Sequence, residues 1–508
     1  MRRGKVLSWM LSIFFAMAIR STAWGQFNVG PFEITGFYQY YVATSTEHAN
    51  PNNFACLSVI VGQYKCSPGL QKKGGKPDLL LMRQLLDVNI FGKLNENWSV
   101  TFEPRFFFDM TKIVDNHFRQ YESLPVPFPG NGSMLRGGGN DFKAELWQAY
   151  TDYRSGNLWL RLGKQQIAWG EALGLRVLDT VNPLDLSQNL STDRAFEEFD
   201  RVRIPQWFLR ADYTIPNESI QDLTAEFILN PGMVVPTILP PQGSPFNVVP
   251  ASLKVRNQVR QGEPTVGGRI TGTVDPMQFS LNFVTKPNDD AIGVFRTFLP
   301  SPVFPSNCLF GVPGIPPAFP CVALNGKHPR IYVLGGSANY NWTWAGAILR
   351  AETTVTPNAP FSSNTAGIPT DIVKRPVWKT VLAVDRPTYL IPGLDSMTIG
   401  LQLFETYTAG KRAGLTDAAG AKVDSNVNIF TVFFQQPLFQ KRVSLEFFGL
   451  FDTDDAHWLQ PGVHWEVGNN VRLDLYYNKF GGAEKRGSRF GSNMNFINGP
   501  FFRFTYGL

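Results

Sequence analysis

The last seven residues of the chain alternate large apolar side chains with small or polar ones up to the final position. In an extended strand, successive side chains point to opposite faces. One face of this strand would therefore carry Phe502, Phe504, Tyr506 and Leu508. A membrane-spanning sheet needs an apolar outer face and no open edge, and a terminal strand of this kind can close against the first one. The pattern predicts an all-β fold, a transmembrane antiparallel β-barrel.

The N-terminus resembles an export signal. Residues 1–5 carry three basic side chains, and residues 6–19 form an apolar run that is too short to span a bilayer. Small residues at 23 and 25 predict cleavage before Gln26, which leaves residues 26–508 as a single barrel domain. The alternative, an uncleaved anchor helix, is disfavoured by Arg20 and by the short run. No Cys lies at the cleavage position, which argues against a lipoprotein.

The charge of the chain does not indicate a nucleic-acid partner. The formal net charge is +6, but the predicted signal contributes four basic residues and no acid. The remaining chain has 43 basic against 41 acidic residues, a net charge of +2. The mean hydropathy is -0.12, and no later segment is an apolar helix long enough to span a membrane. Membrane residence would therefore require alternating strands.

Four cysteines form two close pairs in Gly-, Pro- and Asn-rich stretches, Cys56 with Cys66 and Cys308 with Cys321. In an oxidising periplasm, two local disulfides, Cys56–Cys66 and Cys308–Cys321, are the simplest of the possible connectivities. Unpaired buried thiols are the alternative. A metal site is disfavoured because no His lies near either pair.

Alternating strands and turn signals give a regular rhythm along the chain. Eight short turns are predicted near Asn95, Gly156, Asn217, Pro276, Asn341, Pro392, Pro437 and Asn469. Nine long connections are predicted at 43–80, 110–141, 170–205, 231–264, 286–329, 355–375, 409–425, 453–460 and 481–496. Seventeen connections imply 18 strands, with 16 as the alternative. An even number places both termini at the periplasmic side and the long loops outside.

Polar positions of the strands are expected to face the lumen, because a charge facing lipid near the midplane costs about 2–4 kcal/mol. The predicted pore wall comprises Arg83, Asp87, Glu103, Arg105, Arg161, Arg210, Asp212, Arg269, Arg350, Glu446 and Arg472, with Glu226, Glu352, Asp474 and Arg503 in the same register. The near balance of signs predicts Arg–carboxylate ladders rather than strong ion selectivity.

The third long loop, residues 170–205, combines seven acids and four arginines with many aliphatic residues. A simple surface loop would leave those aliphatic side chains nothing to pack against. We expect the loop to fold into the barrel and constrict the pore; the alternative is a compact external hairpin. The candidate constriction residues are Glu171, Arg176, Asp179, Asp185, Asp193, Arg194, Glu197, Glu198, Asp200, Arg201 and Arg203.

Three runs carry a resemblance to a known family: residues 163–171 (GKQQIAWGE), 178–185 (LDTVNPLD) and 201–205 (RVRIP). The chain resembles the proteobacterial outer-membrane family called domain of unknown function 1302. The resemblance implies an outer-membrane location and a role in moving hydrophobic or amphipathic compounds such as lipids, sterols or aromatics. It implies no catalytic residues and no cofactor.

Inward-facing aromatic side chains are unexpected in a watery pore. Phe107, Phe433 or Phe434, and Phe448 lie in the polar register of their strands. They would either form an apolar path for a substrate or pack the inward-folded loop. His464 is expected to face the lumen as a hydrogen-bonding wall residue.

Catalytic motifs are lacking in the sequence. There is no Gly-x-Ser-x-Gly elbow or Walker loop, and His457 beside Asp452, Asp454 and Asp455 is more typical of a solvated loop. We therefore expect a non-enzymatic outer-membrane channel for facilitated diffusion of hydrophobic or amphipathic small molecules, without metal or cofactor. The alternatives are a general porin for polar solutes and a structural barrel that sheathes a periplasmic partner.

Overall fold

The computed structural model describes most of the chain after the predicted signal. The described residues are 27–47, 50, 55–56, 66–67, 78–114, 133–136, 142–187, 194–195, 199–240, 245–246, 248, 253–299, 321–365, 368–389, 394–453, 455–482 and 491–508. The predicted signal peptide, residues 1–25, lies outside them.

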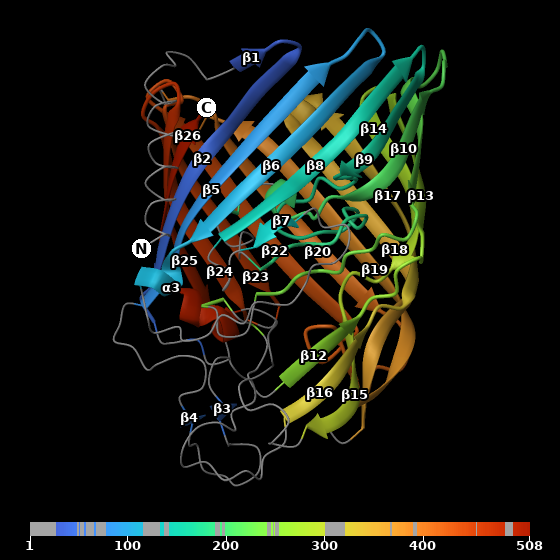
Figure 1. The fold of residues 1–508 in the computed structure, drawn as a ribbon, viewed down its shortest axis with the longest axis vertical. Coiled ribbons are helices and arrows are strands. Elements are labelled where there is room, and N and C mark those ends of the chain that lie inside the picture. The colour runs from blue at the N-terminus through green and yellow to red at the C-terminus, as the bar shows by residue number, and fades with distance from the viewer. Residues whose placement is uncertain are drawn as a thin grey trace.

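Eighteen antiparallel strands form the barrel wall, each paired with the next along the chain (Figure 1). Its first half consists of β2 (Phe32–Ser45), β5 (Asp78–Lys93), β6 (Trp98–Asp109), β8 (Phe142–Ser155), β9 (Leu158–Gln165), β10 (Gln206–Thr214), β11 (Gln221–Asn230), β13 (Thr265–Val274) and β14 (Met277–Pro287). Its second half consists of β17 (Arg330–Trp342), β18 (Ala347–Thr365), β19 (Ile368–Thr388), β20 (Met397–Thr408), β22 (Asn426–Leu438), β23 (Val443–Asp452), β24 (His457–Glu466), β25 (Val471–Gly481) and β26 (Gly499–Gly507).

The last strand closes the sheet on the first. β26 pairs with β2 from Phe37↔Gly507 to Ala43↔Phe501, so the barrel is closed and has no free edge. The prediction of 18 strands is confirmed. In β26, Arg503 is fully buried while Phe502 is 37% exposed, as the terminal alternation predicts.

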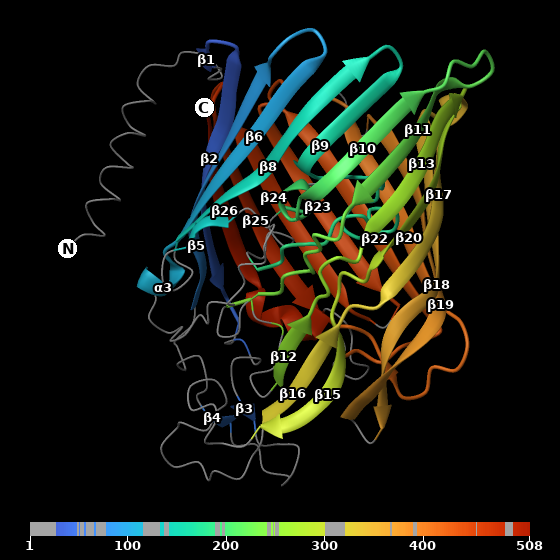
Figure 2. The same cartoon turned by 45° about the vertical axis from the view of Figure 1, so that its right-hand side comes forward.

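Short turns and long connections fall at opposite ends of the barrel (Figure 1). The short turns, the C-terminus and β1 (Phe27–Val29) lie at the top of that view. Elements of the long connections lie at the other end, including a small sheet of β12 (Leu253–Gln258), β15 (Ile292–Leu299) and β16 (Cys321–Lys327) (Figure 2).

Further short elements accompany the wall in the described residues. β1 pairs with β2, β7 (Ser133–Arg136) with β8, and β21 (Leu415–Thr416) with β18. The short helical elements are α3 (Thr111–Val114), η3 (Phe199–Arg201), η5 (Thr343–Ala345) and η7 (Gly491–Ile497). Within the part of the chain that the structure describes, no helix is long and apolar enough to cross a membrane.

The predicted long loop at 355–375 is wrong. β18 and β19 extend through this region as one long hairpin, paired from Ile348↔Asp385 to Thr365↔Ile368. A register shift between Thr356 and Ala359 accommodates Pro357, and Pro360 lies within the ladder opposite Lys374. The extension is stabilised by packing of Phe361 and Val377 on residues of the 409–425 connection, a long-range contact that local sequence does not reveal.

The first predicted disulfide falls on a short hairpin of β3 (Ala55–Cys56) and β4 (Cys66–Ser67). The backbone register places Cys56 directly opposite Cys66, a separation of Cα atoms that suits a disulfide. The side chains of Cys56, Cys66 and Cys321 and the whole of Cys308 lie outside the described residues. Both disulfides therefore stay predictions.

Candidate functional site

Residues 166–205 connect β9 to β10, and we refer to them as the inner segment. On one side of the barrel they contact β18 and β20. The carboxylate of Glu352 on β18 accepts hydrogen bonds from the backbone N–H of Glu171 and of Leu178. Gln402 on β20 exchanges two hydrogen bonds of 3.2 Å with the backbone of Leu173. Each wall side chain thereby satisfies backbone groups of a segment that forms no ladder of its own there.

A buried lysine of β14 binds the middle of the inner segment. Lys286 Nζ donates to the carbonyls of Thr180 at 2.6 Å and Val181 at 2.8 Å. Its third partner is Asp289, 2.6 Å away in the connection after the strand. Burial raises the pKa of Asp289, and the neighbouring ammonium opposes that rise. The lysine thus uses its three donors on one fixed set of acceptors.

Further along the inner segment, Arg194 and Ala195 contact β23 and β24. Arg194 forms a two-pronged ion pair with Glu446 on β23, with Nε 2.9 Å from Oε2. The neighbouring backbone N–H of Ala195 donates to Gln460 Oε1 on β24 at 2.8 Å. Glu446 is 3% exposed, so this ion pair is buried inside the barrel.

Arg201 connects the inner segment to β2 and β6. Its guanidinium donates to Gln39 Oε1 and Tyr41 Oη on β2 at 2.9 and 3.0 Å, while its carbonyl accepts from Arg105 on β6 at 3.3 Å. The wall strands contacted, β2, β6, β14, β18, β20, β23 and β24, are spread around the closed ladder. A single connection that contacts all of them lies within the lumen and crosses it.

The inner segment is also cross-linked to itself. Arg203 donates three hydrogen bonds of 2.9–3.2 Å to the Asp179 carboxylate, with both side chains buried. The Asn182 amide accepts from Ile167 N at 2.9 Å and donates to Ile204 O at 2.8 Å. These bonds join the start, middle and end of the segment into one compact unit.

The aliphatic residues of the inner segment pack on the inner face of the wall. Ile167, Trp169 and Val181 form a buried cluster with residues of β10, β11, β14 and β17. Val177 packs with Val381 of β19 and Phe404 of β20. The packing explains why the sequence of this connection is rich in Leu, Ile and Val.

Of the candidate constriction residues, eight lie in the described part of the chain and three do not. Asp193, Glu197 and Glu198 lie outside it. The contacts of Asp179, Arg194, Arg201 and Arg203 are given above; the others are Glu171 with Asn339 at 2.8 Å, Arg176 with Asp179 at 3.5 Å, Asp185 with Lys143 at 3.4 Å, and Asp200 with Arg203 at 2.5 Å. Asp179 and Asp200 thus pair with arginines of the inner segment itself, and Asp185 pairs with Lys143 of the wall.

The candidate wall residues form ion pairs along and between neighbouring strands. The pairs are Arg83–Asp109 at 3.1 Å, Arg105–Asp87 at 2.8 Å, Arg105–Glu103 at 3.1 Å, Arg161–Asp152 at 2.7 Å, Arg210–Asp212 and Arg210–Glu226 at 3.1 Å, Arg350–Asp385 at 2.6 Å, Arg472–Glu466 at 3.5 Å and Arg503–Asp474 at 2.7 Å. Arg269 lies directly opposite Glu226 in the register. Positive and negative groups alternate closely, which leaves little net field of either sign in the wall.

Sequence reasoning missed several residues that hold the inner segment. Gln39, Tyr41, Gln402, Gln460 and Lys286 all bind it, and four of the five are uncharged. The alternation of each strand could have identified them as facing the lumen, because each lies at an inward-facing position. His464 faces inward as predicted, 8% exposed, with Nδ1 2.5 Å from Asp474 Oδ1.

Inward aromatic side chains pack against the inner segment. Phe107, Phe433 and Phe448 are buried in one cluster, against which Leu173 and Leu175 are packed. Gly174 has φ +80°, and a Cβ there would lie 3.0 Å from the Phe448 ring. These contacts support the interpretation that the rings pack the inner segment; the alternative was an apolar path for a substrate.

No metal-binding cluster is found among the described residues. No group of three or more His, Cys, Asp or Glu side chains there is placed to hold a metal ion. Asp454, part of the acidic stretch before His457, lies outside the described residues.

A family model described as "Protein of unknown function (DUF1302)" matches residues 93–497, which cover most of the barrel and the whole inner segment. The chain belongs to the DUF1302 family. The three runs that suggested this family lie within the match. A search of curated protein sequences found no significant match to this chain.

Several solved outer-membrane structures align with this DUF1302 chain. OccAB3 of Acinetobacter baumannii aligns at 8% identity and a TM-score of 0.48, covering 94% of this chain and 100% of that one. The outer membrane channel DcaP of Acinetobacter baumannii aligns at 9% identity and a TM-score of 0.40, covering 95% and 100%. Salmonella typhi OmpF, in a complex with daunomycin, aligns at 9% identity and a TM-score of 0.41, also covering 95% and 100%.

Proposed function

We propose that the protein is an outer-membrane channel of a Gram-negative bacterium. It would pass hydrophobic or amphipathic small molecules by facilitated diffusion, without catalysis. The observation that carries the proposal is the inner segment, which contacts wall strands around the barrel through buried hydrogen bonds and ion pairs. A connection held this firmly within the lumen acts as a fixed constriction rather than a surface loop.

The apolar character of the solute is supported by the cluster around Phe448. This cluster lies inside the barrel and is contiguous with Leu173 and Leu175 of the inner segment. The rings of the cluster are themselves buried, and the apolar surface that remains accessible beside the constriction is that of the partly buried Leu173 and Leu175. Such a surface would stabilise an apolar solute and disfavour a hydrated ion. The resemblance of residues 163–171, 178–185 and 201–205 to the DUF1302 family points in the same direction.

A general porin for polar solutes is the second candidate, because the wall also carries many charged side chains. Their ion pairs are mutually compensated, as in Arg210 with Asp212 and Glu226, and such a wall would favour neither sign of ion. A barrel that sheathes a periplasmic partner would need an open lumen, and the ties of the inner segment to Glu446 and Gln39 weigh against that function.

Single-channel conductance in a planar bilayer tests the proposal. The full chain should conduct weakly, and a variant lacking residues 176–200 should conduct severalfold more. A matched control lacks residues 417–421, a turn that Thr416 and Lys422 bracket as a bridged pair in the 409–425 connection. The control should conduct like the full chain. Large conductance in all three proteins would contradict the constriction and favour the general porin or the sheath.

A further inference from the structure

Two polar side chains of the wall have buried donor atoms without a partner, and the two residues lie directly opposite each other. Arg269 on β13 pairs in register with Asn282 on β14. Within the part of the chain that the structure describes, Arg269 Nε and Asn282 Nδ2 are buried and form no hydrogen bond. A buried donor that lacks an acceptor is costly, so a neighbouring pair of them indicates a missing acceptor.

Both side chains face the lumen. Their chain neighbours Ile270 and Leu281 are 45% and 62% exposed on the outer surface of the barrel. Successive residues of a strand point to opposite faces, so Arg269 and Asn282 point inward. Asn282 is only 7% exposed, and Arg269 is partly buried.

The pair lies beside the inner segment. On β14, Asn282 lies between the short turn at Met277 and Lys286, which binds carbonyls of the inner segment. The next residue in the register row is Gly335 of β17, and Leu178 of the inner segment packs over that glycine. The two donors are therefore at the edge of the proposed constriction, on the side of the short turns.

The acids nearest to Arg269 are held by other groups. The carboxylates whose charges act on it belong to Glu226, Glu171 and Asp212, but none of these forms an ion pair with it. Glu226 and Asp212 each pair with Arg210 at 3.1 Å. Glu171 accepts a hydrogen bond of 2.8 Å from an asparagine of β17. Among the described residues, Arg269 has no hydrogen bond or ion pair of its own.

Water in the lumen reaches this part of the wall. Glu171 is exposed, and the inward-facing side chains of Arg210 and Asp212 are 21% and 17% exposed. A solute can therefore approach the row of Arg269 and Asn282 from the lumen.

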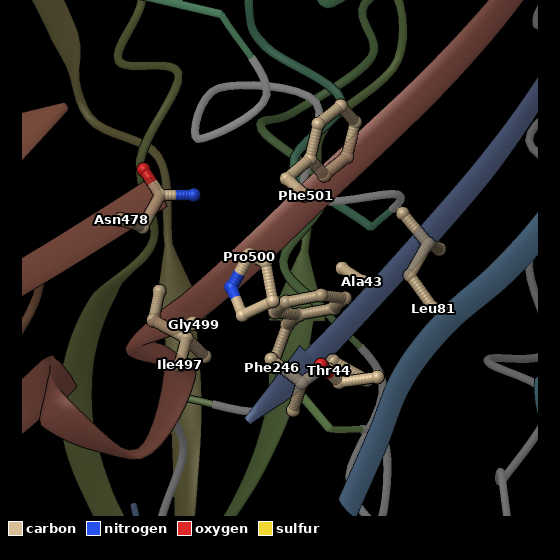
Figure 3. A pocket seen from close by; sticks show the side chains of 10 residues that line it. Ala43, Thr44, Leu81, Phe246, Asn478, Ile497, Gly499, Pro500 and Phe501 are labelled. Carbon is tan, nitrogen blue, oxygen red and sulfur yellow. The ribbon is translucent and has the colours of Figure 1, made fainter. Parts of the chain in front are cut away.

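The pocket beside the ends of β2 and β26, at the other end of the barrel, contrasts with this pair (Figure 3). It has room for about one water molecule. The amide that lines it, Asn478, accepts hydrogen bonds of 3.0 Å from Trp458 and 2.9 Å from Gln460. The unused donors of Arg269 and Asn282 therefore offer a solute more than this pocket does.

The chemistry that fits the pair is a carboxylate. The N–H groups of a guanidinium and of an amide donate hydrogen bonds and accept none. An ionised carboxylate only accepts hydrogen bonds, carries the opposite charge and can take two bonds from one guanidinium. A cation would leave both donors unused.

We infer that Arg269 and Asn282 bind the carboxylate head group of an amphipathic acid as it passes the inner segment. The inference rests on the proposed channel function and narrows its solutes to molecules with an apolar body and an acidic head. The other charges of the wall are compensated by ion pairs, such as Arg210 with Asp212. The unpaired guanidinium therefore selects the head group at one place without making the whole pore selective for anions.

Binding of radiolabelled phenylbutyrate tests the site. The protein in lipid nanodiscs is dialysed to equilibrium against this probe, and empty nanodiscs correct for its partition into lipid. Arg269→Met should weaken binding about tenfold or more, and Asn282→Leu severalfold, because each removes a donor to the carboxylate. The matched control, Arg472→Met, removes an arginine of the wall that already pairs with Glu466 and should bind like the wild type.

A third variant should act in the opposite direction. Glu171 is an exposed acid close enough for its charge to act on Arg269, so it would repel a bound carboxylate. Glu171→Gln keeps the shape of the side chain and should bind the probe severalfold more tightly. A loss of folding cannot produce that result. Phenylbutanamide, which resembles the probe in shape but carries no charge, should not displace it.

Wild-type binding no greater than that of empty nanodiscs, or equal binding by all four variants, would overturn the site and leave the channel function intact. Displacement of the probe by acetate at the same concentration as by unlabelled phenylbutyrate would overturn the amphipathic class, because the head group alone would then account for binding. The channel function is decided separately by conductance. No rise in conductance on deletion of residues 176–200 would overturn it, and the solute class with it.

Discussion

At the scale of single residues, the buried guanidinium of Arg203 ties the inner segment together. Arg203→Met leaves Asp179 buried without its main partner, and breaking a buried pair in this way costs about 3–5 kcal/mol. The double variant Arg203→Met/Asp179→Leu removes both charges and should recover most of the loss. The measurement is the free energy of unfolding in detergent micelles, followed by tryptophan fluorescence.

An exposed ion pair of the wall supplies the control for that experiment. The side chains of Arg472 and Glu466 are 33% and 43% exposed, and their separation is 3.5 Å. Pairs of this kind contribute about 0–1 kcal/mol, so Arg472→Met should change stability little. Equal losses in the two arginine variants would contradict the structural role assigned to Arg203.

Sequence reasoning at the residue scale identified charges better than contacts. Period-two alternation placed Arg83, Asp87 and Arg105 in the inward register, because a one-residue slip would turn them to lipid. It did not find Gln402 or Lys286 as ligands of inner-segment carbonyls. Those contacts join residues far apart in the chain, and no local pattern encodes which inward side chain meets which turn.

At the scale of elements, the turn between β22 and β23 carries an identifiable conformational cost. Phe439, Gln440 and Lys441 have φ of 51°, 58° and 66°, a region that costs a non-glycine residue about 1–2 kcal/mol. Lys441→Gly should therefore stabilise the barrel by up to about 1 kcal/mol, after the entropy that glycine loses on folding. Chemical denaturation of the refolded protein measures the change.

The turn between β5 and β6 provides the comparison. Glu96 lies there and is not among the residues with positive φ. Glu96→Gly therefore relieves no backbone strain and should be neutral or destabilising. Stabilisation of similar size by both glycines would show that left-handed strain is not the cause.

Turn chemistry also explains how far the elements were predictable. Asn, Gly and Pro at strand ends revealed the hairpins, and the count of 18 followed from their spacing. The same reasoning failed at 355–375, where prolines lie within a paired hairpin. Tertiary packing on Leu415 and Val423 overrides the local signal there.

At the scale of the whole molecule, aromatic side chains are exposed toward both ends of the wall. Trp98, Trp342 and Tyr213 lie near the short turns, while Trp378 and Tyr407 lie toward the long connections, each at least 37% exposed. Two such girdles flanking an apolar band are typical of a barrel that spans a membrane. The outer surface and the filled lumen are therefore consistent with one function, a constricted passage across lipid.

Depth along one strand tests where the lipid lies. Leu281 and Met277 face outward on β14, 62% and 38% exposed, with Leu281 near mid-height and Met277 at the end beside a short turn. Leu281→Arg should lower stability in lipid vesicles by about 2–4 kcal/mol, and Met277→Arg by only about 0–1 kcal/mol. Equilibrium denaturation in vesicles measures both variants. Because strand, face and substituted charge are the same, only the depth in the bilayer distinguishes them. Equal losses would mean that the apolar band does not coincide with a membrane, and the channel function would fail with it.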